Sequence, residues 1–181
     1  MSIRLRSIRD SELQAFLEAR LREAASMGFP FDSDADAGTR LRERIRRSGH
    51  FEDGELMLAI EERGRLVGEV QARQPEHGLP PGVFELGISV FDERDRGRGI
   101  GRRAVAAITR RLFSEEGAHR VQLTTDVDNA PMRGAAERLG FVHEGVLRSF
   151  MPSPEGPRDY AIYAMTRDDW ERERGRWTTG S

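Results

Sequence analysis

Residues 95–104 read DRGRGIGRRA, with glycine at 97, 99 and 101 and arginine around them. A glycine inside a helix costs roughly 1 kcal/mol relative to alanine, so three of them at a helix start imply a compensating role. Without side chains, the backbone N–H groups of such a turn converge on an anion, and the helix start adds about half a positive charge. The stretch therefore predicts a phosphate-binding turn.

The charges near this turn favour the same interpretation. No Asp or Glu occurs between Gly97 and Ser114, although acidic side chains normally stabilise a first helical turn. The chain has no lysine, so a single arginine carries little weight and a plain glycine turn remains the alternative. The spacing fits neither a Walker loop nor G-x-G-x-x-G with a later acidic residue, which disfavours nucleotides as ligands.

The pattern on both sides of the turn predicts a mixed α/β domain. Alternation at period two predicts strands at 2–8, 55–62, 65–73, 83–91, 120–127, 141–150 and 159–166. Helical spacing predicts helices at about 9–25, 39–49, 99–116 and 131–140. With 181 residues, the chain suits a single domain at 1–181, with a core at about 3–170 and a short polar tail at 171–181.

Composition excludes several classes of function. A formal net charge of -2 favours neither nucleic acid nor a membrane surface as partner. The absence of cysteine removes thiolate chemistry, and the four histidines lack ligand-like spacing, so no metal is expected. No apolar run approaches the ~20 residues of a membrane span, from which we expect a cytoplasmic protein.

The order of motifs resembles the GNAT superfamily of N-acetyltransferases. RGRGIG follows the strand FELGISVF and precedes NAPMRGAAERLGF, and Arg96, Gly99 and Gly101 match the family's signature. Within the superfamily, the chain is most similar to the group of ribosomal-protein N-terminal acetyltransferases. That similarity rests on Glu85-Leu86-Gly87, Asn129 to Met132, Glu137 to Phe141, and Asp159. The resemblance implies a mixed, mostly antiparallel sheet of about seven strands flanked by about four helices.

The resemblance also implies a set of residues that bind acetyl-CoA. The turn would hold its pyrophosphate through Arg96, Gly97, Arg98, Gly99, Ile100, Gly101 and Arg102. Backbone amides near Val90 and Phe91 would polarise the thioester carbonyl. Asn129, the only asparagine, would bond the cofactor arm, although its place before Ala130-Pro131 equally suits a helix N-cap.

Transfer to an amine needs a group that removes the amine's proton near pH 7. Glu85 is the expected base, acting directly or through water, and the alternative is an exposed strand carboxylate or a partner for an arginine. Phe84 and Leu86 would raise its pKa by burial unless alternation points them to the opposite face. Met132 stands where relatives often have an acid, and it has no proton to donate. Tyr160 and Tyr163 are expected to pack in the last strand instead.

The sequence thus predicts an acetyl-CoA-dependent N-acetyltransferase that acts on a primary amine by direct attack in a ternary complex. A non-catalytic acyl-CoA binding or sensing module is the alternative, because the base and the acid are not fixed. A protein N-terminus and a small-molecule amine both remain as acceptors, and a homodimer is compatible with the resemblance. Asp32, Asp34 and Asp36 would attract a cationic amine or form a solvated acidic turn.

Overall fold

The computed structural model describes residues 2–27, 35–74 and 78–177, so Asp32 and Asp34 lie outside the described residues. Within these ranges a seven-stranded sheet has the order β1-β2-β3-β4-β5-β7-β6. Its strands are β1 (Ile3–Arg6), β2 (Glu55–Glu62), β3 (Arg65–Arg73), β4 (Val83–Val90), β5 (Arg120–Asp126), β6 (Val142–Met151) and β7 (Arg158–Thr166). Neighbouring strands are antiparallel except β4 and β5, which are parallel. The expected mixed, mostly antiparallel sheet is confirmed.

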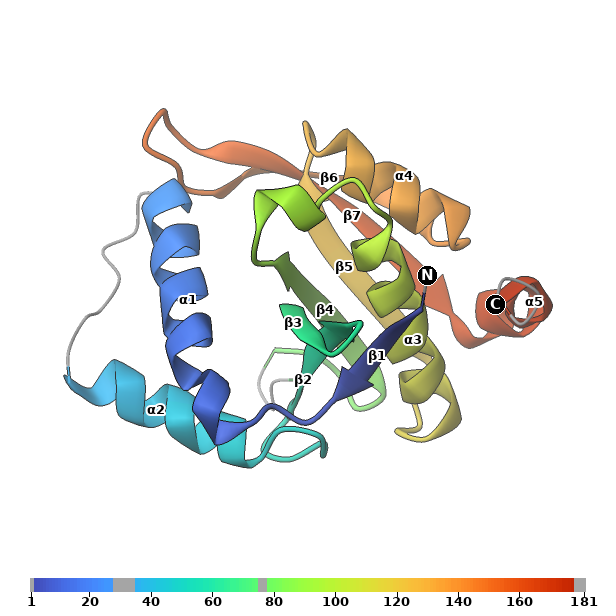
Figure 1. The fold of residues 1–181 in the computed structure, drawn as a ribbon. Helices are drawn as coiled ribbons and strands as arrows, with labels where there is room; N and C mark the ends of the chain where they lie inside the picture. Colours follow the sequence, from blue (N-terminus) through green and yellow to red (C-terminus); the bar gives the residue numbers. More distant parts are fainter. Residues whose placement is uncertain (1, 28–34, 75–77, 178–181) are drawn as a thin grey trace.

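Helices cover both faces of the sheet in the described part of the chain. They are α1 (Leu13–Met27), α2 (Ala35–Arg46), α3 (Ile100–Ser114), α4 (Ala130–Arg138) and α5 (Arg167–Trp177). In Figure 1, α1 and α2 lie on one side of the sheet and α3 on the other, with α5 beside it. The sheet therefore separates two layers, and a ligand that contacts both α1 and α3 has to pass through the sheet.

Strand alternation divides the core between these two layers, because successive residues face opposite sides of a sheet. On the α3 side, Leu58 and Ile60 of β2 belong to one buried cluster with Ile108. On the α1 side, Met57 belongs to a second cluster with Phe16. The apolar face of each helix thus packs against every second residue of the strands beneath it.

The sheet is split between its two parallel strands. Pairing of β4 with β5 runs from Val83↔Arg120 to Leu86↔Leu123 and ends there. β4 continues to Val90, still paired with β3, whereas β5 continues in pairing with β7. A gap therefore opens on the β5 side of β4 from Gly87 onward, just before the glycine turn.

A fifth helix occupies residues that the sequence predicts as a polar tail. Thr166 and Asp169 exchange hydrogen bonds between backbone N–H groups and side-chain oxygens, which caps the start of α5. Trp170 of α5 stacks on Phe113 of α3, with ring centroids 5.6 Å apart. Because residues 167–177 are almost all polar, this tertiary contact is invisible in the local pattern.

Candidate active site

A large cleft passes through the split in the sheet. Its volume is about 1190 Å³, and its walls come from α1, the end of β4, the glycine turn and α4. From the sequence-predicted site it contains Val90, Phe91, Arg96, Gly97, Gly99, Ile100, Gly101, Arg102 and Asn129. Glu85 and Arg98 do not line it. The structure therefore brings together nine of the eleven predicted residues, from three separate segments of the chain.

The glycine turn has the geometry that an anion site requires. Gly97 and Gly99 have φ of 71° and 73°, a conformation that residues with a Cβ rarely adopt. Gly99 is the N-cap of α3 and supplies no side-chain cap, and the first turn of that helix carries no acidic residue. The amides at this helix start are therefore directed into the cleft without a side chain of their own to bind.

Arg98 belongs to the support of the turn. Its guanidinium donates to Glu62 at 2.8 Å and to Asp95 at 2.7 Å, and both carboxylates are buried. Arg65 donates twice to Asp95, which holds the pKa of that carboxyl below its usual range. Arg103 adds a further bond to Glu62 at 3.2 Å. These carboxylates were not predicted from the sequence, because their partners come from β3, the glycine turn and α3.

Two other arginines of the cleft are placed for an anionic ligand. Arg102 on α3 and Arg138 at the end of α4 are exposed and line the cleft. Neither forms an ion pair with another described residue. Arg138 was missed as a site residue, although it stands in the motif Glu137 to Phe141. Both side chains are within the same cavity as the amides of the turn.

The direction of the β4 amides decides which of them faces the split. Phe91 N–H donates to the carbonyl oxygen of Val67 on β3 at 3.0 Å. Phe91 is therefore unavailable as an oxyanion donor, contrary to expectation. In an antiparallel pair the bonding direction alternates, so the N–H groups of Ile88 and Val90 point to the opposite side. That is the side on which β5 no longer pairs.

Asn129 fills the role of a helix cap. It is the N-cap of α4, and its Oδ1 accepts from Met132 N–H at 3.2 Å. It also lines the cleft. Because a carboxamide has separate acceptor and donor ends, the cap uses the oxygen and leaves the Nδ2 group for a ligand. The two roles that seemed to compete in the sequence are therefore compatible.

Glu85 lies on the sheet face that α1 and α2 cover, while Phe84 and Leu86 are buried on the α3 side. Its carboxylate is 4.0 Å from Arg73, and its side chain is 30% exposed. Ser89, four residues further along β4, lines the cleft on the same face. At about 3.3 Å per residue, this puts Glu85 about 13 Å from Ser89 along the strand.

The tyrosines are packed as expected. Tyr163 is fully buried; its hydroxyl donates to Glu137 at 2.9 Å and accepts from Arg133 at 3.3 Å. Burial raises the pKa of Tyr160, with a further contribution from the Asp126 carboxylate. Neither ring lines the cleft, whereas Met132 does. The described part of the cleft thus has no tyrosine hydroxyl placed against a leaving thiol.

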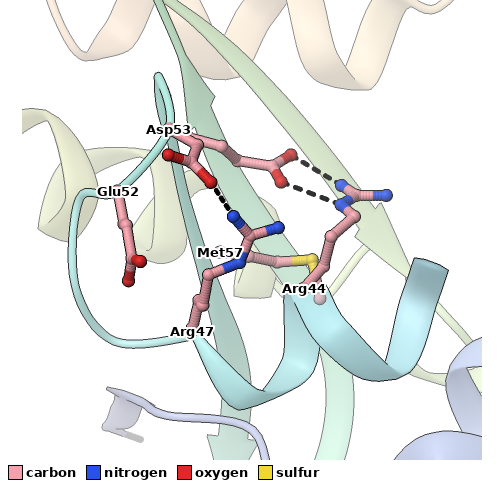
Figure 2. A pocket seen from close by; sticks show the side chains of 6 residues that line it. Arg44, Arg47, Glu52, Asp53 and Met57 are labelled. Carbon is pink, nitrogen blue, oxygen red and sulfur yellow. Dashed lines mark hydrogen bonds and ion pairs between the residues drawn. The ribbon is translucent and has the colours of Figure 1, made fainter. Parts of the chain in front are cut away.

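A second, smaller pocket of about 160 Å³ lies between α2 and the start of β2 (Figure 2). Arg44 donates to both oxygens of Glu55, at 2.8 and 2.6 Å, and Arg47 is paired with Asp53. These charges satisfy each other within the protein. The pocket is therefore an ion-pair network at the surface, and the cleft is the better candidate for a substrate site.

Residues 2–142 match the acetyltransferase (GNAT) domain family. The chain belongs to this family. It is 28% identical over 118 residues to a prophage-derived uncharacterized N-acetyltransferase, YokL, of Bacillus subtilis, a match that covers 65% of each protein. It is also 29% identical over 107 residues to the mycothiol acetyltransferase of Pseudarthrobacter chlorophenolicus, which covers 59% of this chain and 33% of that one. The chain thus spans less than two thirds of either relative.

Solved structures of the GNAT family have the same fold. RimJ of Mycobacterium smegmatis, in complex with CoA-disulfide, superposes with a TM-score of 0.75 at 22% identity, covering 96% of this chain and 86% of that one. Among the residues that the structure describes, no group of three or more His, Asp or Glu is arranged to hold a metal ion. No described helix combines the length and apolarity that a membrane crossing requires.

Proposed function

We propose that this GNAT protein is an acetyl-CoA-dependent N-acetyltransferase that acetylates a primary amine within a ternary complex. The observation that carries the proposal is the cleft through the split sheet. Its α3 side offers the bare amides of Gly97 to Gly101, and its opposite end reaches α1. Two substrates that enter from opposite sides of the sheet meet beside the end of β4, which favours direct attack.

The cofactor is proposed to bind by its charges and its carbonyl. The turn amides, Arg102 and Arg138 fit the phosphates of acetyl-CoA, and Asn129 Nδ2 is free for the pantetheine arm. The Val90 N–H, directed into the split, fits the oxygen of the thioester, where a preorganised donor stabilises the negative charge of the tetrahedral intermediate. A thiol has a pKa near 8.5, so its thiolate leaves without a dedicated acid.

The acceptor is proposed to enter beside α1. Ala15 and Ala19 leave room at this wall, where Glu18 and Glu23 place two carboxylates against the single guanidinium of Arg22. Such a wall suits the ammonium form of an amine better than an anion. Peptide N-termini and small polyamines share this chemistry.

Glu85 is proposed to take the amine's proton through water. Its distance from Ser89 and its position outside the cleft argue against direct contact. Its partial exposure and its place on the acceptor face support a water path to solvent. In this proposal, Arg73 keeps the carboxylate oriented toward that path.

The test measures acetyl-CoA binding by calorimetry and thiol release with a panel of peptides, polyamines and other small amines. We expect binding together with release for at least one class of amine. Glu85→Gln should keep the affinity for acetyl-CoA and lose most of the turnover, since general-base catalysis typically contributes about 10²–10⁴-fold. Glu115→Gln, at an exposed carboxylate outside the cleft, is the matched control.

Two results would contradict the proposal. Acetyl-CoA binding without thiol release across the whole panel would favour the non-catalytic sensing module instead. An absence of binding would remove the cofactor assignment altogether. Unchanged turnover in Glu85→Gln would leave the activity standing and discard only the role of Glu85.

A further inference from the structure

A second carboxylate lies closer to the reaction centre than Glu85. Glu69 of β3 is directly opposite Ser89 of β4 in the antiparallel register. Opposite residues have Cβ atoms about 4.5–5.5 Å apart, and both side chains point to the face covered by α1. Ser89 lines the cleft immediately before Val90, whose N–H faces the split. Glu69 is therefore one side chain away from the place proposed for the thioester.

The bonding of Glu69 is incomplete. Its side chain is 3% exposed, and Oε1 is 2.6 Å from Nη2 of Arg20 on α1. Its other oxygen, Oε2, is buried and has no hydrogen-bond partner among the described residues. Nε of Arg20 is likewise buried without a hydrogen bond, and its Nη2 is held only by the ion pair with Oε1 of Glu69. A buried carboxylate oxygen without a partner is costly, and a structural ion pair alone leaves this cost unexplained.

The charges around Glu69 come from three elements. Arg20 and Glu23 approach from α1, Arg44 from α2, and Glu55 from β2. Arg44 already donates to both oxygens of Glu55 (Figure 2). It also donates to Gln71, so its charge is largely compensated. Burial outweighs both arginines and raises the pKa of Glu69. A carboxylate with a raised pKa is a stronger base than an ordinary exposed one.

Glu69 does not itself line the cleft, so a substrate reaches Oε2 only by displacing the side chains beside Ser89. Resting on the function proposed above, we infer that the bound acceptor makes this displacement, contacts Glu69 through its nitrogen and gives Glu69 its first proton. The amine is the missing partner of Oε2. The ammonium nitrogen gives one proton to Oε2 of Glu69. The neutral amine then attacks the carbonyl carbon of the thioester, and the thioester oxygen accepts a hydrogen bond from Val90 N–H. The C–S bond breaks, the thiolate leaves with the electron pair, and the second proton on nitrogen neutralises it. Glu69 then passes this proton through water to Glu85, which releases it to solvent as the products depart, so Glu85 receives the amine's proton by way of Glu69.

The competing explanation is that Glu69 and Arg20 only hold α1 on the sheet. A double variant distinguishes the catalytic explanation from the structural one, because it removes both charges together and leaves neither of them buried without a partner. The variants are Arg20→Met and the double variant Arg20→Met with Glu69→Gln. For each, thermal unfolding and acetyl-CoA affinity report on the fold, and kcat across pH reports on the base. Turnover by the wild type is established first.

If Glu69 is the base, Arg20→Met keeps kcat within about fivefold of the wild type at its optimum. In this variant the fall of kcat on the acid side of the pH profile moves to higher pH, because loss of the arginine charge raises the pKa of Glu69 further. The double variant should retain acetyl-CoA affinity and lose about 100-fold or more in kcat relative to Arg20→Met. That loss should exceed the loss in Glu85→Gln.

A double variant as active as Arg20→Met would overturn the inference and leave the acetyltransferase activity intact. If the double variant does not fold, Arg20→Met alone decides the question. A pH profile of kcat in Arg20→Met that coincides with the wild-type profile on the acid side would also overturn the inference. A wild type that binds acetyl-CoA and acetylates nothing would instead refute the proposed function, and this inference with it.

Discussion

Arg98 of the glycine turn forms an ion pair with Glu62 at the end of β2, with Nη2 2.8 Å from Oε2. Glu62 is 3% exposed, and its second oxygen accepts from Arg103 of α3. One buried carboxylate thus joins the turn to the helix that follows it and to a strand some 36 residues earlier. The turn that is proposed to bind the phosphates is held by a tertiary contact as well as by its glycines.

Replacing this carboxylate should loosen the turn. In Glu62→Gln, Arg98 and Arg103 lose a charged partner, and we expect a loss of about 1–3 kcal/mol in the free energy of unfolding. Acetyl-CoA affinity should fall as well, by about tenfold, because the amides are less well positioned. Urea unfolding and calorimetry measure the two effects. Glu115→Gln, at an exposed carboxylate outside the cleft, is the control. A Glu62→Gln variant with wild-type affinity would refute the positioning role.

The glycines should separate into two kinds. Gly101 has no positive φ, and a Cβ there meets only Ile88 at 3.7 Å, so Gly101→Ala should fold normally. Because it lines the cleft, we expect its acetyl-CoA affinity to fall at least tenfold. Gly117 has φ of 69° and lies outside the cleft, so Gly117→Ala should cost about 1 kcal/mol and leave affinity unchanged. The opposite pattern would exclude a phosphate site at the turn.

Asn129 offers a test of one side chain with two functions. Asn129→Asp keeps an oxygen for Met132 N–H and loses the amide donor, so stability should be near that of the wild type while acetyl-CoA affinity falls. Asn129→Ala loses both and should be destabilised by about 1 kcal/mol in addition. Thermal unfolding and calorimetry on both variants decide the matter. If Asn129→Asp binds acetyl-CoA as tightly as the wild type, Asn129 caps α4 and does not contact the cofactor.

The start of α1 should respond to acid. Arg6 donates to both oxygens of Glu12, which lowers the pKa of that carboxyl. A lowered pKa in the folded state stabilises the protein above the ordinary glutamate value of about 4.3, and this contribution is lost as pH falls through the folded value. Glu12→Gln should therefore lower the free energy of unfolding at pH 7 by roughly 0.5–1 kcal/mol. Near pH 3 the loss should be much smaller. Thermal unfolding at both values of pH measures the difference.

The control for this experiment is Glu115→Gln, because the Glu115 side chain is 67% exposed. It should unfold at the wild-type temperature at both values of pH. A difference between Glu12→Gln and the wild type that stays constant down to pH 3 would show that the Arg6 pair is not its source.

Much of the cleft was predictable because its signals are local. Glycines at 97 and 99 adopt the positive φ that only a residue without a Cβ takes easily, and the missing first-turn acid of α3 is a property of adjacent residues. The alternation of β4 likewise predicts that Glu85 and its apolar neighbours face opposite sides, as they do. Period and turn chemistry act over a few residues, so they can be read without a partner.

The remaining features depended on which strand lies beside which. The Phe91 amide bonds Val67, Arg98 pairs with Glu62, and Glu69 lies opposite Ser89, all through registers between distant segments. The sequence by itself determined the mixed sheet, the glycine turn before α3 and the family. Only the tertiary structure decided which amide is free, which arginine is already paired and which carboxylate is buried, because hydrogen bonding and desolvation depend on neighbours that folding brings together.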